Sequence, residues 1–209
     1  MNHLTDLSCA SFAEALASKT SVPSGGGAAA MAGALGIALG SMAGNFTAGK
    51  KKFAAVEADV QRMLAEGEQL RIRLLELVDA DAKAFEPLGR AYSIPKDDPN
   101  RLQIMEEATL NACKAPLEMV CCCSKTLLLL EEMQEKCSKL LISDVGCGAL
   151  LCKAAMESAA LNVFVNTGTL RDRETAKKME QQVDETLKTY LPLADRIAAS
   201  VTAYIRKDE

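Results

Sequence analysis

The sequence predicts an all-α protein, a single-domain antiparallel helical bundle over residues 1–209 with a Gly/Ala-rich central helix. No segment shows the sustained two-residue alternation of apolar and polar side chains that half-buried strands require. Long segments instead repeat apolar residues at three- and four-residue spacing, which is typical of amphipathic helices. Apolar residues make up 49% of the chain and aromatic residues only 4%, so the core consists mainly of small and aliphatic side chains that favour helices.

Turn and capping residues divide the first half of the chain into three predicted helices. Thr5 or Ser8 can cap a first helix, because a hydroxyl there accepts a hydrogen bond from a free N–H group of the first turn. Residues 22–27 (VPSGGG) then interrupt the chain. A Gly/Ala-rich helix is expected over about residues 28–45, and a long amphipathic helix over about residues 53–91.

The second half begins with a loop at residues 93–99 (SIPKDDP) and predicts three further helices. Pro116 lies inside the first of them, which predicts a kink or a break near Cys113 because proline lacks an amide donor. Ser143 or Asp144 can cap the second helix. The expected spans are about residues 100–135, 143–166 and 171–207.

The charge balance and the N-terminus exclude several classes of protein. The formal net charge is −4, so the chain lacks the basic excess that binds nucleic-acid phosphates. The N-terminus has no basic segment followed by a long apolar run, so we expect no signal peptide and a cytoplasmic location. Segment 25–44 is long enough to span a membrane, but it is rich in Ala and Gly and no second span is evident beside it. We therefore expect neither a nucleic-acid nor a membrane partner.

The eight cysteines do not predict a metal site. None belongs to a C-x-x-C pair, and His3 is the only histidine, so the ligand spacing of zinc sites is missing. The consecutive cysteines 121–123 point in different directions on a helix. We interpret the cysteines as reduced, buried thiols and expect no bound metal.

Glycines at and inside the second predicted helix indicate close contacts. Gly36, Gly40 and Gly44 share one helix face, although each costs about 1 kcal/mol against alanine. Close packing against another helix explains this stripe, and a closely approaching ligand is the alternative. The segment 24–27 (SGGG) directly precedes the helix, where free N–H groups and the helix dipole can bind an anion or a carbonyl. A plain turn into the helix explains this segment equally well.

Asp81 occupies a position that the helical pattern assigns to the core. The apolar stripe of its helix reads Leu70, Leu74, Leu77, Asp81, Phe85 and Leu88. Asp79 lies about 200° around the helix and should face elsewhere. A buried carboxylate must be paired, hydrogen-bonded or used in chemistry, and burial raises its pKa toward the range that suits proton transfer. An ion pair with a Lys or Arg is the structural alternative.

Three more polar residues lie in or before the apolar helix expected at 143–166. Asn162 and Asn166 are one turn apart on one face and can hydrogen-bond a polar ligand, or else a neighbouring helix. Asp144 belongs to the segment SDVG, where a plain N-cap is the structural alternative. Three lysines at 50–52 follow the glycine-striped helix, where they form a solvated face or contact a polyanionic tail.

Five segments together resemble the cyclodeaminase/cyclohydrolase family of folate enzymes. They are 23–30 (PSGGGAAA), 40–51 (GSMAGNFTAGKK), 77–85 (LVDADAKAF), 143–146 (SDVG) and 162–166 (NVFVN). The family comprises the cyclodeaminase domain of formiminotransferase-cyclodeaminase and stand-alone bacterial methenyltetrahydrofolate cyclohydrolases. The resemblance extends from about Cys9 to Lys178. It implies an all-helical fold, a homodimer and a folate site near the dimer interface.

The resemblance also implies the site residues. Those assigned to catalysis are Asp81 as general acid/base, Asp144 as its orienting or electrostatic partner, and Lys50 at the folate tail or the reacting face. Those assigned to substrate binding are Ser24, Gly25, Gly26, Gly27, Asn45, Thr47, Asn162 and Asn166.

Two departures from the fused enzymes favour a cyclohydrolase. Residues 137–142 (CSKLLI) stand where fused cyclodeaminase domains often carry Gly-Asn, and the sequence shows no transferase domain. The expected reaction is hydrolysis of 5,10-methenyltetrahydrofolate to 10-formyltetrahydrofolate by acid/base catalysis, without a metal or redox cofactor. Formimidoyltetrahydrofolate cyclodeamination, which releases ammonia and forms the methenyl compound, is the close alternative. A non-catalytic helical folate-binding or interaction protein is the alternative of another class.

Overall fold

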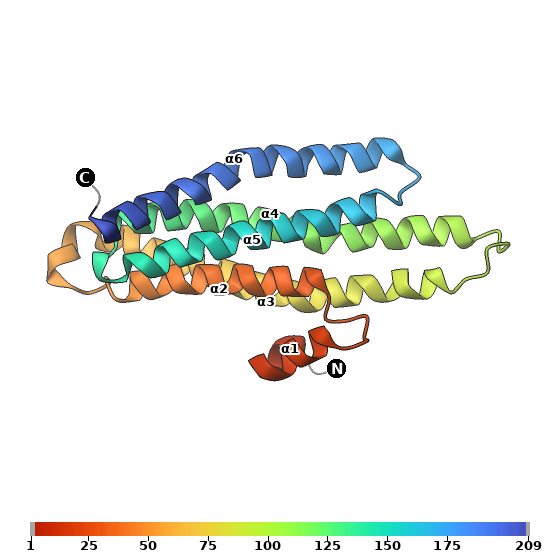
Figure 1. Cartoon of the computed structure of the whole chain (residues 1–209), viewed down its shortest axis with the longest axis horizontal. Helices are drawn as coiled ribbons and strands as arrows, with labels where there is room; N and C mark the ends of the chain where they lie inside the picture. The colour runs from red at the N-terminus through yellow and green to blue at the C-terminus, as the bar shows by residue number, and fades with distance from the viewer. Residues whose placement is uncertain (1–2, 208–209) are drawn as a thin grey trace.

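Long antiparallel helices make up most of the chain (Figure 1). The computed structural model describes residues 3–207. No strand occurs within that range, which confirms the all-α prediction. The elements are η1 (Leu4–Asp6), α1 (Cys9–Ala17), α2 (Gly25–Asn45), η2 (Lys51–Val56), α3 (Glu57–Tyr92), α4 (Arg101–Lys136), η3 (Lys139–Leu141), α5 (Ile142–Thr167) and α6 (Arg173–Arg206), where η denotes a 3-10 helix.

Helices α2, α3, α4 and α5 form a four-helix bundle, and α6 packs along α4 and α5. Short connections make successive helices antiparallel neighbours. The α3–α4 hairpin continues beyond the first turn of α2, so the bundle has one helix fewer at that end (Figure 1). Helix α1 lies outside the bundle and has no buried residue. The first turn of α2 therefore points into a region that α3, α4 and α5 still surround.

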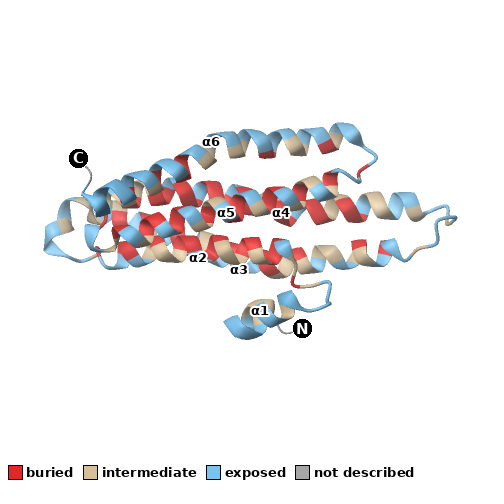
Figure 2. Ribbon diagram, viewed as in Figure 1, coloured by how far each residue is buried: buried red, intermediate tan, exposed pale blue. Residues whose placement is uncertain are grey.

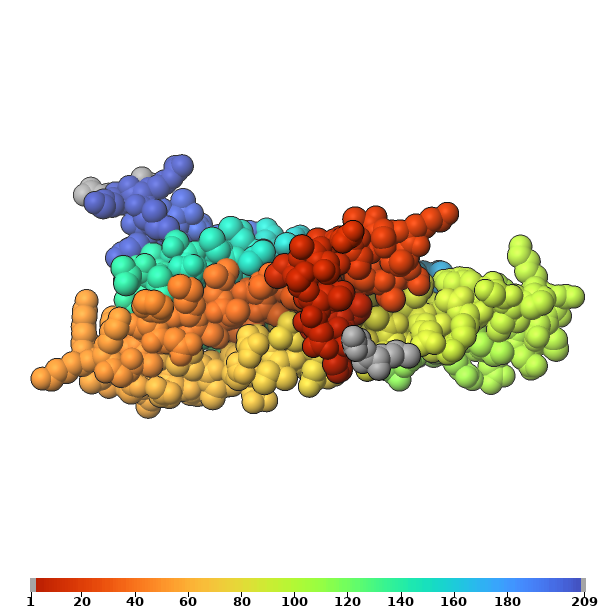
Figure 3. Space-filling model, turned by 90° about the horizontal axis from the view of Figure 1, so that it is seen from below, coloured from red at the N-terminus to blue at the C-terminus, as the bar shows by residue number. Residues whose placement is uncertain are grey.

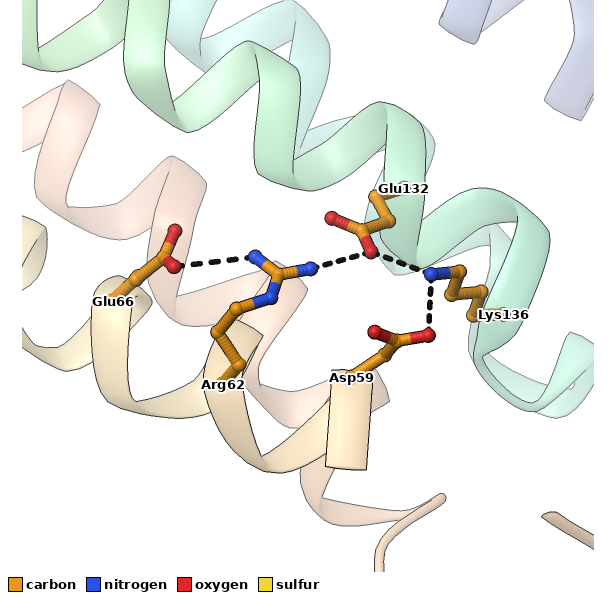
Figure 4. Close-up of polar contacts among 5 residues, drawn as sticks. All are labelled: Asp59, Arg62, Glu66, Glu132 and Lys136. Carbon is orange, nitrogen blue, oxygen red and sulfur yellow. Dashed lines mark hydrogen bonds and ion pairs between the residues drawn. The ribbon is translucent and has the colours of Figure 1, made fainter. Parts of the chain in front are cut away.

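Charged side chains join α3 and α4 along their exposed edge (Figure 4). Arg62 on α3 contacts Glu132 on α4 at 2.5 Å, and Lys136 contacts the same carboxylate at 2.7 Å. Lys136 also contacts Asp59, and Arg62 contacts Glu66. The two cations thus share one carboxylate at the edge between the two helices.

Buried residues lie on the sides of the helices that face one another (Figure 2), and most of them are apolar. Five of the eight cysteines are buried among them, which confirms the interpretation of buried thiols for those five. Burial raises the pKa of the Cys152 thiol to about 12, so it stays protonated and unreactive at neutral pH. Cys9, Cys121 and Cys147 are exposed, and for these three the expected burial is wrong.

The glycine stripe of α2 allows three neighbouring helices to pack closely against it. A Cβ atom on Gly148 of α5 would lie 2.6 Å from the carbonyl oxygen of Gly36, so α2 and α5 meet backbone to backbone. A Cβ atom on Gly40 would meet Leu130 of α4, and one on Gly44 would meet Leu64 of α3. These contacts confirm the close-packing explanation.

Several predicted helix ends need correction. Ser8 caps α1 by accepting a hydrogen bond from the Ser11 N–H, as expected. Helix α2 begins at Gly25 rather than at residue 28, so residues 25–27 are its first turn rather than a loop. Ser143 and Asp144 lie inside the first turn of α5 and do not cap it, because the helix already starts at Ile142.

Two helices are long and apolar enough to cross a membrane by length and composition, Gly25–Asn45 and Lys139–Thr167. The second corrects the expectation that segment 25–44 has no such neighbour. The two pack against each other, and 56% and 44% of their most apolar windows are buried inside the bundle. The remainder of each forms a common outer surface.

Candidate active site around Asp81

Helix α3 places Asp81 against the first turn of α2. The side chain is buried, as the apolar pattern predicts, with an exposed fraction of 9%. The Ser24 hydroxyl donates a hydrogen bond to Asp81 Oδ2 at 2.8 Å, and the Gly27 N–H also donates to the carboxylate. A Cβ atom on Gly26 would lie only 2.4 Å from Asp81 Oδ1, so the carboxylate fits here because residue 26 is glycine. Asp81 thus occupies the anion position at the N-terminus of a helix.

The surroundings of Asp81 are uncharged. Among the ion pairs of residues 3–207, none involves Asp81, so the alternative of a structural pair with a Lys or Arg is wrong. Burial raises the pKa of the Asp81 carboxyl, and the hydrogen bonds from Ser24 and Gly27 offset part of this effect. The carboxyl therefore exchanges a proton closer to neutral pH than an exposed aspartate does.

Asp79 faces away from Asp81, as the helical spacing predicts. Its Oδ1 accepts a hydrogen bond from the Leu4 N–H at 2.8 Å, and its Oδ2 lies 2.7 Å from His3 Nδ1. Asp79 therefore binds the N-terminal segment rather than the first turn of α2. The helical spacing predicts that the two carboxylates point in different directions. No pattern in the sequence predicts that Asp79 binds residues 3–4.

The two asparagines of α5 lie at the same end of the bundle as Asp81. Asn162 lies beside Gly25, where a Cβ atom would be 3.7 Å from Asn162 Nδ2, and it donates to the Ser158 carbonyl of its own helix. Asn166 donates to the Ala112 carbonyl of α4 at 3.2 Å. That carbonyl is the one that Pro116 leaves without a helical partner.

Helix α4 runs through Pro116 without interruption, so of the kink or break predicted near Cys113 the break is wrong. Asn166 supplies a donor to the carbonyl that the proline leaves free. Because the side-chain amide of Asn166 donates to a carbonyl of α4, the structure supports the alternative that this residue hydrogen-bonds a neighbouring helix. The side chain of Asn162 remains at the surface beside the first turn of α2.

Two hollows flank the first turn of α2. One, of about 370 Å³, lies between α2 and α5 and includes Gly25 and Asn162 in its lining. The other, of about 430 Å³, lies between α3 and the N-terminal segment and includes Val22 and Ala82. Neither lining includes Asp81 or Ser24, and the second hollow lies on the Asp79 side of α3.

The remaining predicted site residues lie at the other end of α2. Gly148 touches α2 at Gly36, about 15 Å along the helix from Gly26, so Asp144 lies about 20 Å from Asp81. Asn45 is exposed at the C-terminus of α2, about 28 Å from Gly26, and Lys50 lies over the Phe46 ring beyond it. Within one chain, Asp144 and Lys50 therefore do not meet Asp81.

Thr47 has an exposed fraction of 0% and a structural position. Its hydroxyl donates to the Ala43 carbonyl at 2.7 Å and accepts from the Ser138 N–H at 2.8 Å. These bonds tie the end of α2 to the connection between α4 and α5. These bonds give Thr47 a structural role, and its substrate contact stays a prediction.

Metal ligands are not grouped in residues 3–207, where no three His, Cys, Asp or Glu side chains come together as a metal ion requires. The carboxylate of Asp81 has only hydroxyl and amide partners. The carboxyl can accept and donate a proton while it is largely shielded from solvent.

Comparison with known proteins agrees with this arrangement. The family described as formiminotransferase-cyclodeaminase matches residues 8–185. The chain is 37% identical to methenyltetrahydrofolate cyclohydrolase of Methylorubrum extorquens, covering 93% of this chain and 95% of that protein. It is 27% identical to formimidoyltransferase-cyclodeaminase of Rattus norvegicus, covering 96% of this chain but only 38% of the rat protein.

The fold also matches a solved structure. The crystal structure of formiminotetrahydrofolate cyclodeaminase from Thermotoga maritima superposes with a TM-score of 0.84 at 24% sequence identity, over 96% of this chain and 100% of that one. The likeness extends over the whole helical bundle, and the family match includes Ser24, Asp81, Asp144 and Asn166. The chain therefore belongs to the formiminotransferase-cyclodeaminase family.

Proposed function

We propose that this protein hydrolyses 5,10-methenyltetrahydrofolate to 10-formyltetrahydrofolate. The observation that carries the proposal is the buried Asp81 carboxyl, which has no cationic partner among the described residues and a raised pKa. The likeness to a cyclohydrolase over nearly the whole length of both chains supports the same reaction. We further propose that the reaction proceeds in the cytoplasm without a metal or redox cofactor.

In the proposed mechanism Asp81 moves one proton twice. As general base, it takes a proton from the water that attacks the carbon bridging N5 and N10 of the substrate. As general acid, it gives that proton to N5 while the bond between the carbon and N5 breaks. The hydroxyl proton of the adduct leaves as the formyl carbonyl forms, so the cationic substrate and water yield the neutral product and one proton. Ser24 and the Gly27 N–H hold the ionised carboxylate in place for the first transfer.

Asp81→Asn tests this role. We expect kcat to fall by roughly 100-fold or more, because an amide cannot take the proton. The fold should persist, since the carbonyl oxygen of the new side-chain amide still accepts the bond from the Gly27 N–H. The assay follows loss of the near-ultraviolet absorbance of the methenyl substrate, and the exposed Asp97→Asn serves as control. A folded Asp81→Asn variant with full kcat contradicts the mechanism.

Cyclodeamination is the second candidate, because family relatives carry that name. N10 would attack the formimino carbon on N5, and the adduct would release ammonia. Supplying each substrate separately and measuring methenyltetrahydrofolate consumption, methenyltetrahydrofolate production and ammonia distinguishes the two reactions. Folate binding without turnover of either substrate would instead support a non-catalytic protein.

We also propose a homodimer built on the outer surface that α2 and α5 share. Helix α2 contains no ionisable residue, and its outer side includes Leu35, which is 53% exposed. Leu161 of α5 is 67% exposed on the same side, across the groove between the helices. The residues of this α2–α5 face are Ala28, Ala32, Leu35, Leu39 and Met42 on α2, with Leu150, Ala154, Ser158 and Leu161 on α5. The α2 side of this surface has no charged residue, and on the α5 side Glu157 is an exposed charged residue between Ala154 and Leu161. A mainly apolar surface of this kind is typical of an obligate interface.

A two-fold axis through the middle of α2 would make the helix pack antiparallel to its copy. The N-terminal turn beside Asp81 would then approach the C-terminal end of α2 in the other chain. In that assembly, Asp144 of the partner subunit and Lys50 of the partner subunit would approach Asp81. The homodimer thereby accounts for two groups of predicted site residues that lie about 20 Å apart in one chain.

Leu35→Asp tests the homodimer. A charge at the centre of the α2–α5 face should give monomers in sedimentation velocity and should abolish activity with helicity retained. Leu102→Asp, at a residue that is 52% exposed on the α3–α4 hairpin, is the matched control. Full activity of a monomeric wild-type chain, or binding of the wild-type monomer to lipid vesicles through this face, refutes the dimeric site.

A further inference from the structure

A hollow on the Asp79 side of α3 takes no part in the proposed reaction. It has a volume of about 430 Å³, within the range of roughly 300–1,000 Å³ that is usual for small-ligand pockets. Its walls are mainly apolar and include Leu4, Val22, Ala82 and Phe85. The lining contains neither Asp81 nor any residue of the first turn of α2. The hollow is therefore a separate candidate for ligand binding.

The N-terminal segment forms one wall of this hollow, and Asp79 holds it against α3. Asp79 Oδ1 accepts a hydrogen bond from the Leu4 N–H at 2.8 Å, and Asp79 Oδ2 lies 2.7 Å from His3 Nδ1. Figure 3 shows the N-terminal segment lying across the middle of the molecule. Because α1 has no buried residue, the bonds of Asp79 are a main support of this wall.

The charged residues of the lining leave one cation without a partner. Asp79 is bonded to residues 3–4, and Glu86 pairs with Arg90 at 3.1 Å. Lys83 is exposed and takes part in none of the ion pairs or side-chain hydrogen bonds found within residues 3–207. The Ser21 hydroxyl, also in the lining, has no hydrogen-bond partner in the same range. The polar groups left for a ligand are thus an ammonium and a hydroxyl, and both can donate to a carboxylate.

We propose that this hollow is a second ligand site, which binds a small carboxylate with an apolar body. The apolar body packs between Leu4, Ala82 and Phe85, where it is removed from water. The carboxylate accepts hydrogen bonds from the Lys83 ammonium and the Ser21 hydroxyl at the rim. The ligand contacts both α3 and the N-terminal segment, so its binding also stabilises the docked segment.

Calorimetry with octanoate and with its neutral analogue octanamide tests this site in the full chain. Octanoate should bind, and octanamide should bind roughly two- to fivefold more weakly, the size of an exposed ion pair. Lys83→Met should remove this preference and leave the Kd of octanamide unchanged. Ala82→Trp should weaken both ligands by more than about tenfold, because an indole fills part of the hollow. Lys96→Met and Ala58→Trp, both exposed elsewhere, are the matched controls and should leave both Kd values unchanged.

Asp79→Ala tests the wall. Without the two bonds of Asp79 the N-terminal segment should leave α3, so octanoate should bind at least about fivefold more weakly. In the wild type, bound octanoate should slow amide hydrogen exchange in residues 3–17. An unchanged Kd in Asp79→Ala overturns the part of the N-terminal segment in the site.

Other results would overturn the site itself. No binding of octanoate, or equal Kd values for octanoate and octanamide in the wild type, contradicts a carboxylate site. Undiminished binding in a folded Ala82→Trp variant places octanoate elsewhere on the chain. Displacement of octanoate by folinic acid would show that the hollow belongs to the folate site and is not a second one. Because Lys83 is exposed, Lys83→Met remains informative if Ala82→Trp fails to fold.

Discussion

The contact between Gly26 and Asp81 ties the stability of the first turn of α2 to the proposed catalytic group. In Gly26→Ala the new Cβ atom would lie 2.4 to 2.5 Å from three atoms of the Asp81 carboxyl. That is about 1 Å closer than non-bonded atoms normally approach, so the carboxyl must move. Movement breaks the bonds from Ser24 and the Gly27 N–H. Activity should fall together with stability.

The expected loss follows from opposing effects. Overpacking of this kind costs about 1–3 kcal/mol, whereas alanine in place of a helical glycine stabilises by at most about 1 kcal/mol. We therefore expect Gly26→Ala to lower the free energy of unfolding by roughly 1–2 kcal/mol. In the double variant Gly26→Ala/Asp81→Ala the clash is absent, so the two losses should not add. The expected coupling energy is about 1–2 kcal/mol.

Urea unfolding of the wild type, both single variants and the double variant, followed by far-ultraviolet circular dichroism, measures this coupling. Gly89→Ala is the control, because a Cβ atom there would meet the Phe85 ring at an ordinary distance of 3.5 Å. The control should be neutral or slightly stabilising. Additive losses within about 0.5 kcal/mol, or an undiminished kcat in Gly26→Ala, would refute the described contact.

Two further predictions concern the ends of the helices. Thr47→Val leaves the Ser138 N–H without its acceptor. The free energy of unfolding should therefore fall by about 1–3 kcal/mol, and kcat should stay unchanged. A lower kcat at full stability would instead support a role in substrate binding. The pKa of Glu132 is lowered by its bonds with Lys136 and Arg62, so its stabilising effect is present at neutral pH and lost as pH falls through the lowered pKa. Glu132→Gln should therefore lower the free energy of unfolding by less than about 1 kcal/mol at neutral pH. This loss of stability should vanish in acid and in high salt. A loss that changes with neither pH nor salt would contradict the ion-pair explanation.

Helix periodicity was sufficient to predict the burial of Asp81 and the different direction of Asp79. Both follow from local geometry, because a residue's place on a helix face depends only on spacing along the chain. The capping role of Ser8 is local in the same sense. The pattern could not predict the contact with α2, because Gly26 and Asp81 meet only after the chain folds back.

Pro116 shows why local rules fail in the folded bundle. Proline removes one donor, and that loss alone predicts a break. The donor is replaced by Asn166, which is distant in sequence and reaches the Ala112 carbonyl from another helix. Thr47 is similar, since its acceptor role depends on the Ser138 N–H. Long-range partners of this kind leave no trace in composition or spacing.

The hydrogen bonds that hold Asp81 connect its protonation to the order of α2. A charged carboxylate accepts both the Ser24 hydroxyl and the Gly27 N–H, so it anchors the start of the helix. A carboxyl that has just taken a proton is a poorer acceptor, and its attraction to the helix dipole disappears. Fraying of the first turn should therefore increase during the half of the catalytic cycle in which Asp81 carries the proton. The first turn of α2 would therefore become less ordered as the adduct forms and Asp81 takes the proton. It would become ordered again once N5 has been protonated and Asp81 is charged.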